Sequence, residues 1–173
     1  AETASIFAEM LLESRLLKTA NARERKIILL RQLDHLYASI NRQAFFVMFE
    51  ELAHDHISEL NLDQLEEKYL SLLHEQFDGA LEVPDLFRHE WLYIPHIFHT
   101  PFYCYAYAFG NLLVLALYNM YLREGEKGVS KIIKILSYGG SKRPADILRE
   151  VGIDISSEKF WQEGFDVIES MIT

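Results

Sequence analysis

Residues 100–122 read TPFYCYAYAFGNLLVLALYNMYL, a run without a single Asp, Glu, Lys or Arg. A helix that lacks charge on every face is normally buried among other helices or in a membrane. The run is long enough to cross a bilayer, but tyrosines and asparagines interrupt it and its strongly apolar part, Leu112–Leu117, is short. We therefore predict a helix from Phe102 to about Arg123 at the centre of a helical bundle, with no membrane role.

Apolar residues recur at helical spacing before this segment. Residues 2–18 form an amphipathic pattern, and residues 22–60 contain neither Gly nor Pro, which predicts one long helix, straight or bent. Asn61 followed by Gln64 has the spacing of a capping box and predicts the start of the next helix. That helix should end in the segment 78–85, which contains Gly79 and Pro84.

The remaining chain also lacks any strand pattern. Pro95 and Pro101 bound a segment with two histidines that we expect to be a loop, because proline disfavours a continuous helix. Three more helices are expected after the central one, over the ranges 127–136, 144–151 and 157–172. The sequence thus predicts an all-α fold with a long N-terminal helix pair and a buried central helix, in one domain spanning residues 1–173.

Composition narrows the class of protein. Of the 173 residues, 50% are apolar and 25% are charged, as in a globular domain with a substantial core. The formal net charge of −9 argues against a nucleic-acid partner, which needs a basic surface. The single cysteine, Cys104, lies in an apolar aromatic stretch, so a buried thiol in the reducing cytoplasm is expected. The start at Ala1 carries no secretory signal pattern, and we expect the chain to be a piece of a longer protein.

Residues 95–110 carry the most specific pattern, a histidine loop followed by Pro-Phe-Tyr-Cys-Tyr and then a helix that reads Ala-Phe-Gly at residues 108–110. This pattern resembles oligoendopeptidase F and its relatives in the thimet oligopeptidase group. Residues 2–9, Glu-Thr-Ala-Ser-Ile-Phe-Ala-Glu, resemble a second segment of that family. The resemblance covers the whole chain and implies a segment of the C-terminal catalytic domain of a zincin-like metallopeptidase.

The resemblance also implies roles for individual residues. Glu2 corresponds to the third zinc ligand, and Glu9, seven residues later on the same helix face, would orient a zinc-bound histidine. Tyr105 would donate a hydrogen bond to the oxyanion, His96 would be a second donor, and Tyr103 would contact the substrate. The expected cofactor is zinc and the expected partners are short peptides, cut at internal bonds.

One element of the family is missing from the chain: the H-E-x-x-H motif with two histidine ligands and the general base. Neither His74-Glu75 nor His89-Glu90 is followed by a histidine at the required spacing. In the family this motif precedes the equivalent of Glu2, so we expect it in the remainder of the parent polypeptide. The isolated chain should then be inactive, hold zinc weakly and tend to self-associate through apolar surface that the remainder would cover.

Other interpretations stay open at this point. The chain could be a non-catalytic helical binding module on the same scaffold. Tyr107, Tyr118 and Tyr121 fit core tyrosines with satisfied hydroxyls, and residues 54–56, His-Asp-His, fit a solvated helix face better than a metal site. His99 fits a simple loop histidine. A metal-independent enzyme is disfavoured because no Ser-His-Asp or Cys-His arrangement can be argued.

Overall fold

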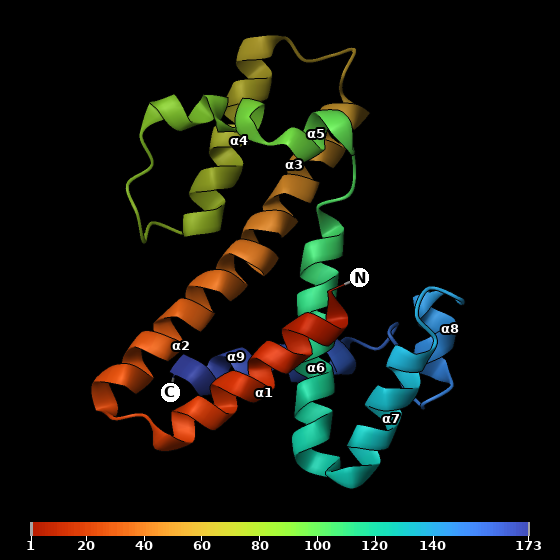
Figure 1. The fold of residues 1–173 in the computed structure, drawn as a ribbon. Helices are drawn as coiled ribbons and strands as arrows, with labels where there is room; N and C mark the ends of the chain where they lie inside the picture. Colours follow the sequence, from red (N-terminus) through yellow and green to blue (C-terminus); the bar gives the residue numbers. More distant parts are fainter. Residues whose placement is uncertain (1, 173) are drawn as a thin grey trace. The chain divides into compact units, whose positions relative to one another are not determined.

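The computed structural model describes residues 2–172, and all regular structure within that range is helical, which confirms the all-α prediction (Figure 1). The α-helices are α1 (Thr3–Thr19), α2 (Ala22–Leu36), α3 (Arg42–Asp55), α4 (Leu62–Phe77), α5 (Pro95–His99), α6 (Tyr105–Glu124), α7 (Glu126–Ser137), α8 (Pro144–Arg149) and α9 (Glu158–Ile172). A π-helical segment, η1 (Tyr37–Asn41), joins α2 to α3, and a 3-10 helix, η2 (Asp85–Tyr93), precedes α5.

Most predicted boundaries agree with the structure, and the exceptions lie around the prolines and turns. The long helix continues through η1 but ends at Asp55 instead of Leu60. The segment predicted as a loop contains α5, because Pro95 occupies the first turn of that helix, where its missing N–H costs nothing. Helix α6 begins at Tyr105 and not at Phe102, since Phe102 has a φ of 61°, which lies outside the helical region.

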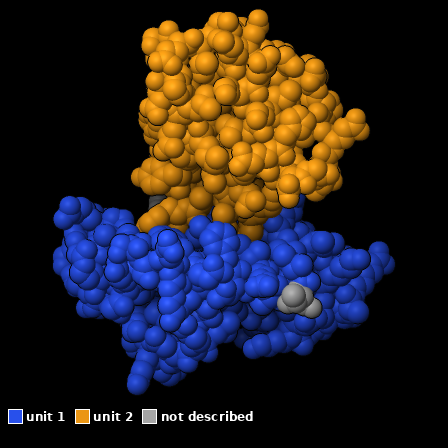
Figure 2. Space-filling model, turned by 180° about the vertical axis from the view of Figure 1, so that it is seen from behind, with its two compact units in different colours: residues 1–35, 110–173 blue, residues 36–109 orange. Residues whose placement is uncertain are grey.

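The chain divides into two compact units (Figure 2). Unit 1 comprises residues 1–35 and 110–173, and unit 2 comprises residues 36–109. The single domain over residues 1–173 stays a prediction.

The greater part of α6 forms the core of unit 1. Its side chains from Leu113 to Tyr118 are all buried, which confirms the predicted burial of this helix. Phe7 of α1 packs edge-on against Tyr118 and Tyr121, with ring centroids 6.2 and 6.1 Å away. On α9, a Cβ placed on Gly164 would lie only 3.1 Å from the carbonyl oxygen of Leu112. Glycine at position 164 therefore allows α9 to approach the backbone of α6.

Helix α7 also approaches the backbone of α6 closely, at Gly128, so we expect a larger side chain at this position to destabilise the fold. A Cβ on Gly128 would meet the Cα of Tyr121 at 3.0 Å, whereas a Cβ on Gly110 would meet nothing within 4 Å. We expect Gly128→Ala to lower the free energy of unfolding by about 1–3 kcal/mol through overpacking. Gly110→Ala, the matched control, should leave it unchanged or raise it by roughly 0.5–1 kcal/mol through helix propensity. Urea denaturation of both variants would show this, and equal effects would contradict it.

Unit 2 has its own core of buried residues from α3, α4, η2 and the turn before α6: Phe46, Phe49, Tyr69, Leu73, Trp91 and Cys104. The Phe49 ring lies 4.8 Å from Tyr69 and 5.7 Å from Trp91. Cys104 has no exposed surface, and its burial, together with the nearby Glu50, raises the pKa of the thiol to about 11. The predicted burial of this thiol is confirmed. The predicted capping box of Asn61 and Gln64 is also present at the start of α4.

A buried tyrosine in this core predicts a loss of stability at alkaline pH. The Tyr69 hydroxyl donates to Glu90 Oε2 at 2.8 Å, and Glu90 also pairs with Arg42. Burial, and then the hydrogen bond to Glu90, raise the pKa of Tyr69 above its ordinary value. Because the folded protein resists deprotonation of Tyr69, its contribution to stability is complete below about pH 10 and is lost as the pH rises further. Urea titrations at pH 8 to 11 should show a steeper loss in the wild type than in Tyr69→Phe; equal slopes would refute this.

Within residues 2–172, no helix is both long enough and apolar enough to cross a membrane.

Candidate functional site

Three aromatic side chains of unit 2 meet at the segment that the sequence analysis singled out. His96 Nε2 and the Tyr107 hydroxyl are joined by a hydrogen bond of 2.9 Å. The rings of His96 and Tyr103 lie nearly parallel, with centroids 6.0 Å apart and an interplanar angle of 8°. The Tyr107 ring stands almost perpendicular to both, at 5.5 Å from His96 and 5.6 Å from Tyr103. We call His96, Tyr103 and Tyr107 the His96 cluster.

The backbone between α5 and α6 brings these residues together. Pro95 starts α5, so His96 lies in the first turn of that short helix. The amide of Thr100 donates to the His96 carbonyl at 3.0 Å and ends the helix, and the amide of Tyr103 donates to the Thr100 carbonyl at 3.2 Å. The chain thus reverses within a few residues. Tyr103 and the first turns of α6 return beside His96.

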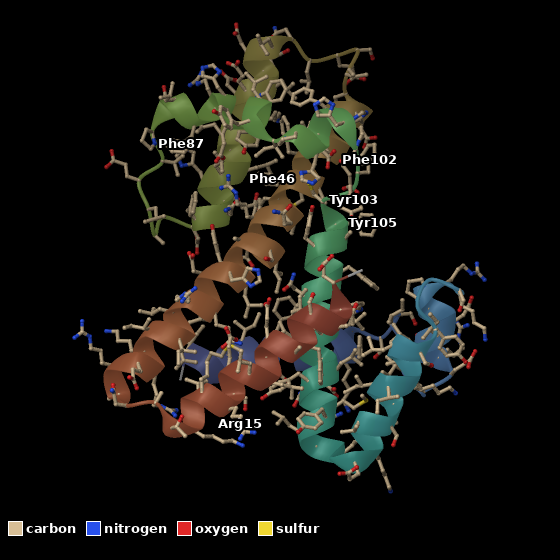
Figure 3. All side chains as sticks on the ribbon, viewed as in Figure 1. Arg15, Phe46, Phe87, Phe102, Tyr103 and Tyr105 are labelled. Atoms are coloured by element: carbon tan, nitrogen blue, oxygen red, sulfur yellow. The ribbon has the colours of Figure 1, made fainter. Side chains whose placement is uncertain are left out.

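Tyr105 has a different environment from its two neighbours in the motif. Its side chain is 59% exposed and lies at the start of α6 (Figure 3). Residues two apart on a helix do not face each other, so Tyr105 and Tyr107 cannot both point at His96. Among the described residues, His96 is brought together with Tyr103 and Tyr107, and not with Tyr105.

Tyr107 is the functional candidate that the sequence analysis did not select. The sequence predicts a core tyrosine with a satisfied hydroxyl; the hydroxyl is indeed bonded, but its partner is a candidate site residue. Its position inside the same motif as His96 was the available signal. Tyr118, which is buried, and Tyr121, which is half-buried against Phe7, agree with the core assignment.

Glu2 belongs to unit 1, where it precedes the first turn of α1. Its side chain is exposed and accepts a hydrogen bond of 3.2 Å from the Ser5 hydroxyl, which also bonds to the Glu2 carbonyl at 2.9 Å. Glu9 is exposed on the same helix. Between residues 2 and 172 no three His, Cys, Asp or Glu side chains are grouped so that they could hold a metal ion. The described residues therefore do not form a complete zinc site, and the ligand role of Glu2 stays a prediction.

The remaining histidines of interest lie at the surface. His54, Asp55 and His56 are exposed, as expected for a solvated helix face. The His54 ring packs 4.7 Å from that of Phe102, and His56 Nδ1 lies 3.0 Å from Glu59 Oε2. His99 is likewise exposed at the end of α5.

The family model and the related proteins that match this chain are all peptidases. Residues 1–167 match the family described as peptidase family M3. An oligoendopeptidase F homolog of Borreliella burgdorferi is 36% identical over 162 residues, which cover 91% of this chain and 27% of that protein. The oligopeptidase PepF of Bacillus subtilis is 31% identical over 183 residues, covering 99% of this chain and 27% of that protein.

A solved structure shares the fold. The crystal structure of oligoendopeptidase-F from Enterococcus faecium superposes with a TM-score of 0.89 over 99% of this chain and 33% of that chain, at 24% identity. The chain thus spans roughly a third or less of the length of these relatives.

Proposed function

The chain belongs to peptidase family M3, and from this premise we propose that it forms part of the active site of a longer zinc-dependent oligoendopeptidase. That polypeptide would hydrolyse internal bonds of short peptides in the cytoplasm, where the buried thiol of Cys104 would stay reduced. The names of the relatives, oligoendopeptidase F and PepF, support the reaction class. The observation that carries the proposal is the hydrogen bond between His96 and Tyr107 beside Tyr103, within the motif that the family resemblance marks.

The His96 cluster and Tyr105 would have different roles in binding the substrate and stabilising the reaction intermediate. Tyr107 orients the imidazole through Nε2, which leaves Nδ1 of His96, unpaired among the described residues, to contact the substrate or the intermediate. Tyr105 has an exposed side chain, and a phenol hydroxyl can donate a hydrogen bond to an oxyanion. Tyr103, with a side chain about half-exposed, would contact the substrate through its ring.

Zinc would be held mainly by residues outside this chain. Glu2 has an exposed carboxylate, and carboxylates are accepted zinc ligands, so this residue fits the third-ligand role. The two histidines and the general-base glutamate of the H-E-x-x-H motif would come from the rest of the polypeptide. When bound, zinc activates a water molecule and polarises the peptide carbonyl.

Exposed apolar side chains in unit 1 are consistent with a partner that covers them. Leu12 and Leu16 on α1 are 57% and 45% exposed, and Ile27 and Leu30 on α2 are 49% and 55% exposed. We expect the remainder of the polypeptide to pack there, and the isolated chain to self-associate.

Metal content and hydrolysis test the proposed function. After dialysis against a mild chelator, the isolated chain should retain far less than one equivalent of zinc, because one carboxylate cannot replace a four-coordinate site. The longer polypeptide, which we expect to contain the H-E-x-x-H motif, should retain about one equivalent and cleave an internally quenched peptide. Stoichiometric zinc in the isolated chain, or a longer polypeptide that binds peptides without cleaving them, would overturn the proposal. The second outcome would favour a binding module.

A further inference from the structure

A buried carboxylate contacts the turn that carries Tyr103. Glu50 lies in the last part of α3 and has no exposed surface. Its Oε1 accepts a hydrogen bond of 2.9 Å from the backbone amide of Phe102, a residue 52 positions later in the chain. Its Oε2 is buried without a hydrogen-bond partner among the described residues. A buried acid in such a place is costly, and a role in packing alone would be met better by Leu or Met.

The residue that Glu50 holds has an unusual backbone conformation. Phe102 has a φ of 61°, in the left-handed region that side chains other than Gly rarely adopt. The turn then ends at Tyr103, whose amide bonds to Thr100, and α6 begins two residues later. The conformation of Phe102 therefore determines the direction in which Tyr103 leaves the turn and α6 starts.

Two further contacts hold the same turn. The Phe102 ring packs on His54, which lies one helical turn after Glu50 on α3. Cys104 has no exposed surface and lies near Glu50, whose charge contributes to the raised pKa of the thiol. The turn is thus fixed against α3 from several sides. Among these contacts, Glu50 makes the hydrogen bond to the backbone of the strained residue.

From these contacts we infer that Glu50 is a positioning residue for the His96 cluster. Glu50 accepts a hydrogen bond from the Phe102 amide and so stabilises the left-handed turn. This turn sets the Tyr103 ring parallel to that of His96 and directs the Tyr107 hydroxyl to His96 Nε2. Strain held in place by surrounding structure is typical of sites whose geometry must be kept. The inference rests on the proposed function for its catalytic consequence, but the positioning itself is a property of this chain.

Three variants of the isolated chain separate positioning from general stability. Glu50→Leu fills the same buried position with an apolar side chain and removes the oxygen that accepts the hydrogen bond from Phe102. Glu50→Gln keeps a side-chain carbonyl oxygen that can accept this hydrogen bond. Glu66→Leu is the matched control, because Glu66 is also buried in unit 2 but pairs with His89 of η2 and not with the turn. All three are expected to lose some stability, so stability is not the readout.

The measured quantities are the ¹⁵N and ¹H NMR chemical shifts of the His96 imidazole ring. In the wild type, the bond to Tyr107 should hold the ring in one tautomer. In Glu50→Leu, the ring ¹⁵N shifts should move toward those of a free histidine, while Glu50→Gln and Glu66→Leu should keep the wild-type values. Unchanged His96 signals in a folded Glu50→Leu variant would overturn the inference.

Two further measurements test the inference, and the first needs no variant, so it holds even if Glu50→Leu does not fold. Amide exchange in the wild type should show Phe102 protected by on the order of 100-fold or more, since its N–H is bonded to a buried acceptor. An unprotected Phe102 amide would overturn the inference without any variant. In the longer polypeptide, Glu50→Leu should lower kcat by roughly 10- to 100-fold with little change in KM, as for a small displacement of a catalytic group. If that polypeptide proved inactive, the proposed function would fail while the NMR result still decided the role of Glu50.

Discussion

Replacing Tyr105 with Phe in the longer polypeptide should lower kcat for peptide hydrolysis by about two to three powers of ten, the usual loss when one oxyanion donor is removed. The volume and packing of the side chain stay the same, so KM should change little. Zinc content should stay normal, because Tyr105 is not proposed as a ligand. Steady-state kinetics and metal analysis of the same preparations would measure all three quantities.

Tyr93→Phe is the matched control for this experiment. Tyr93 also belongs to unit 2, is 89% exposed and lies outside the motif, so its hydroxyl should have no effect on kcat. Tyr107→Phe should differ from both, since it removes the hydrogen bond to His96 and should alter the NMR signals of that ring in the isolated chain. If Tyr105→Phe stayed within about twofold of the wild type, Tyr105 would not be the oxyanion donor.

Replacing Phe49 with Ala should lower the free energy of unfolding by about 3–5 kcal/mol, which is the usual cost of truncating a buried phenylalanine. Phe49 is only 1% exposed, and its ring contacts Tyr69 and Trp91 at the centre of unit 2. The cavity would remain largely unfilled, because aromatic rings from α4 and η2 surround it and cannot all move inward. Urea denaturation followed by the fluorescence of Trp91 and Trp161 would measure the loss.

Phe87→Ala makes the same chemical change at the surface. Phe87 lies in η2 and is 45% exposed, so its removal should cost less than about 1 kcal/mol (Figure 3). A small effect at Phe49, similar to that at Phe87, would mean that the aromatic core of unit 2 does not hold this part of the chain together.

Local signals in the sequence predicted the helices well. The uncharged run around Leu112–Leu117 predicted a buried helix because only a buried helix can be apolar on all faces, and the structure buries Leu113 to Tyr118. The pair Asn61 and Gln64 predicted a helix start because its two side chains satisfy backbone amides within four residues. The helix α5 was missed because two prolines disfavour a long helix but not a single short turn that begins with one of them.

The sequence predicted which segment forms the candidate site but not which of its side chains contact one another. The segment with His96, Tyr103 and Tyr105 could be selected because the order of residues is itself the signal, and the same order identifies the family. The sequence could not show which tyrosine meets His96, since that depends on the direction in which α6 leaves the turn. Nor could a metal site be predicted within the chain, because the motif that would supply the other ligands is not in it.

The sequence by itself determined the helical class, the central position of α6 and the membership of the family, because periodicity and motif order depend on neighbouring residues alone. Only the tertiary structure decided that Tyr107, and not Tyr105, bonds to His96, and that Glu50 binds the backbone of Phe102. The first contact joins residues 11 apart across a turn, the second joins residues 52 apart, and the turn contains one residue with a positive φ. A left-handed phenylalanine has no local sequence signal, because the surrounding fold, and not the intrinsic preference of the residue, stabilises that conformation.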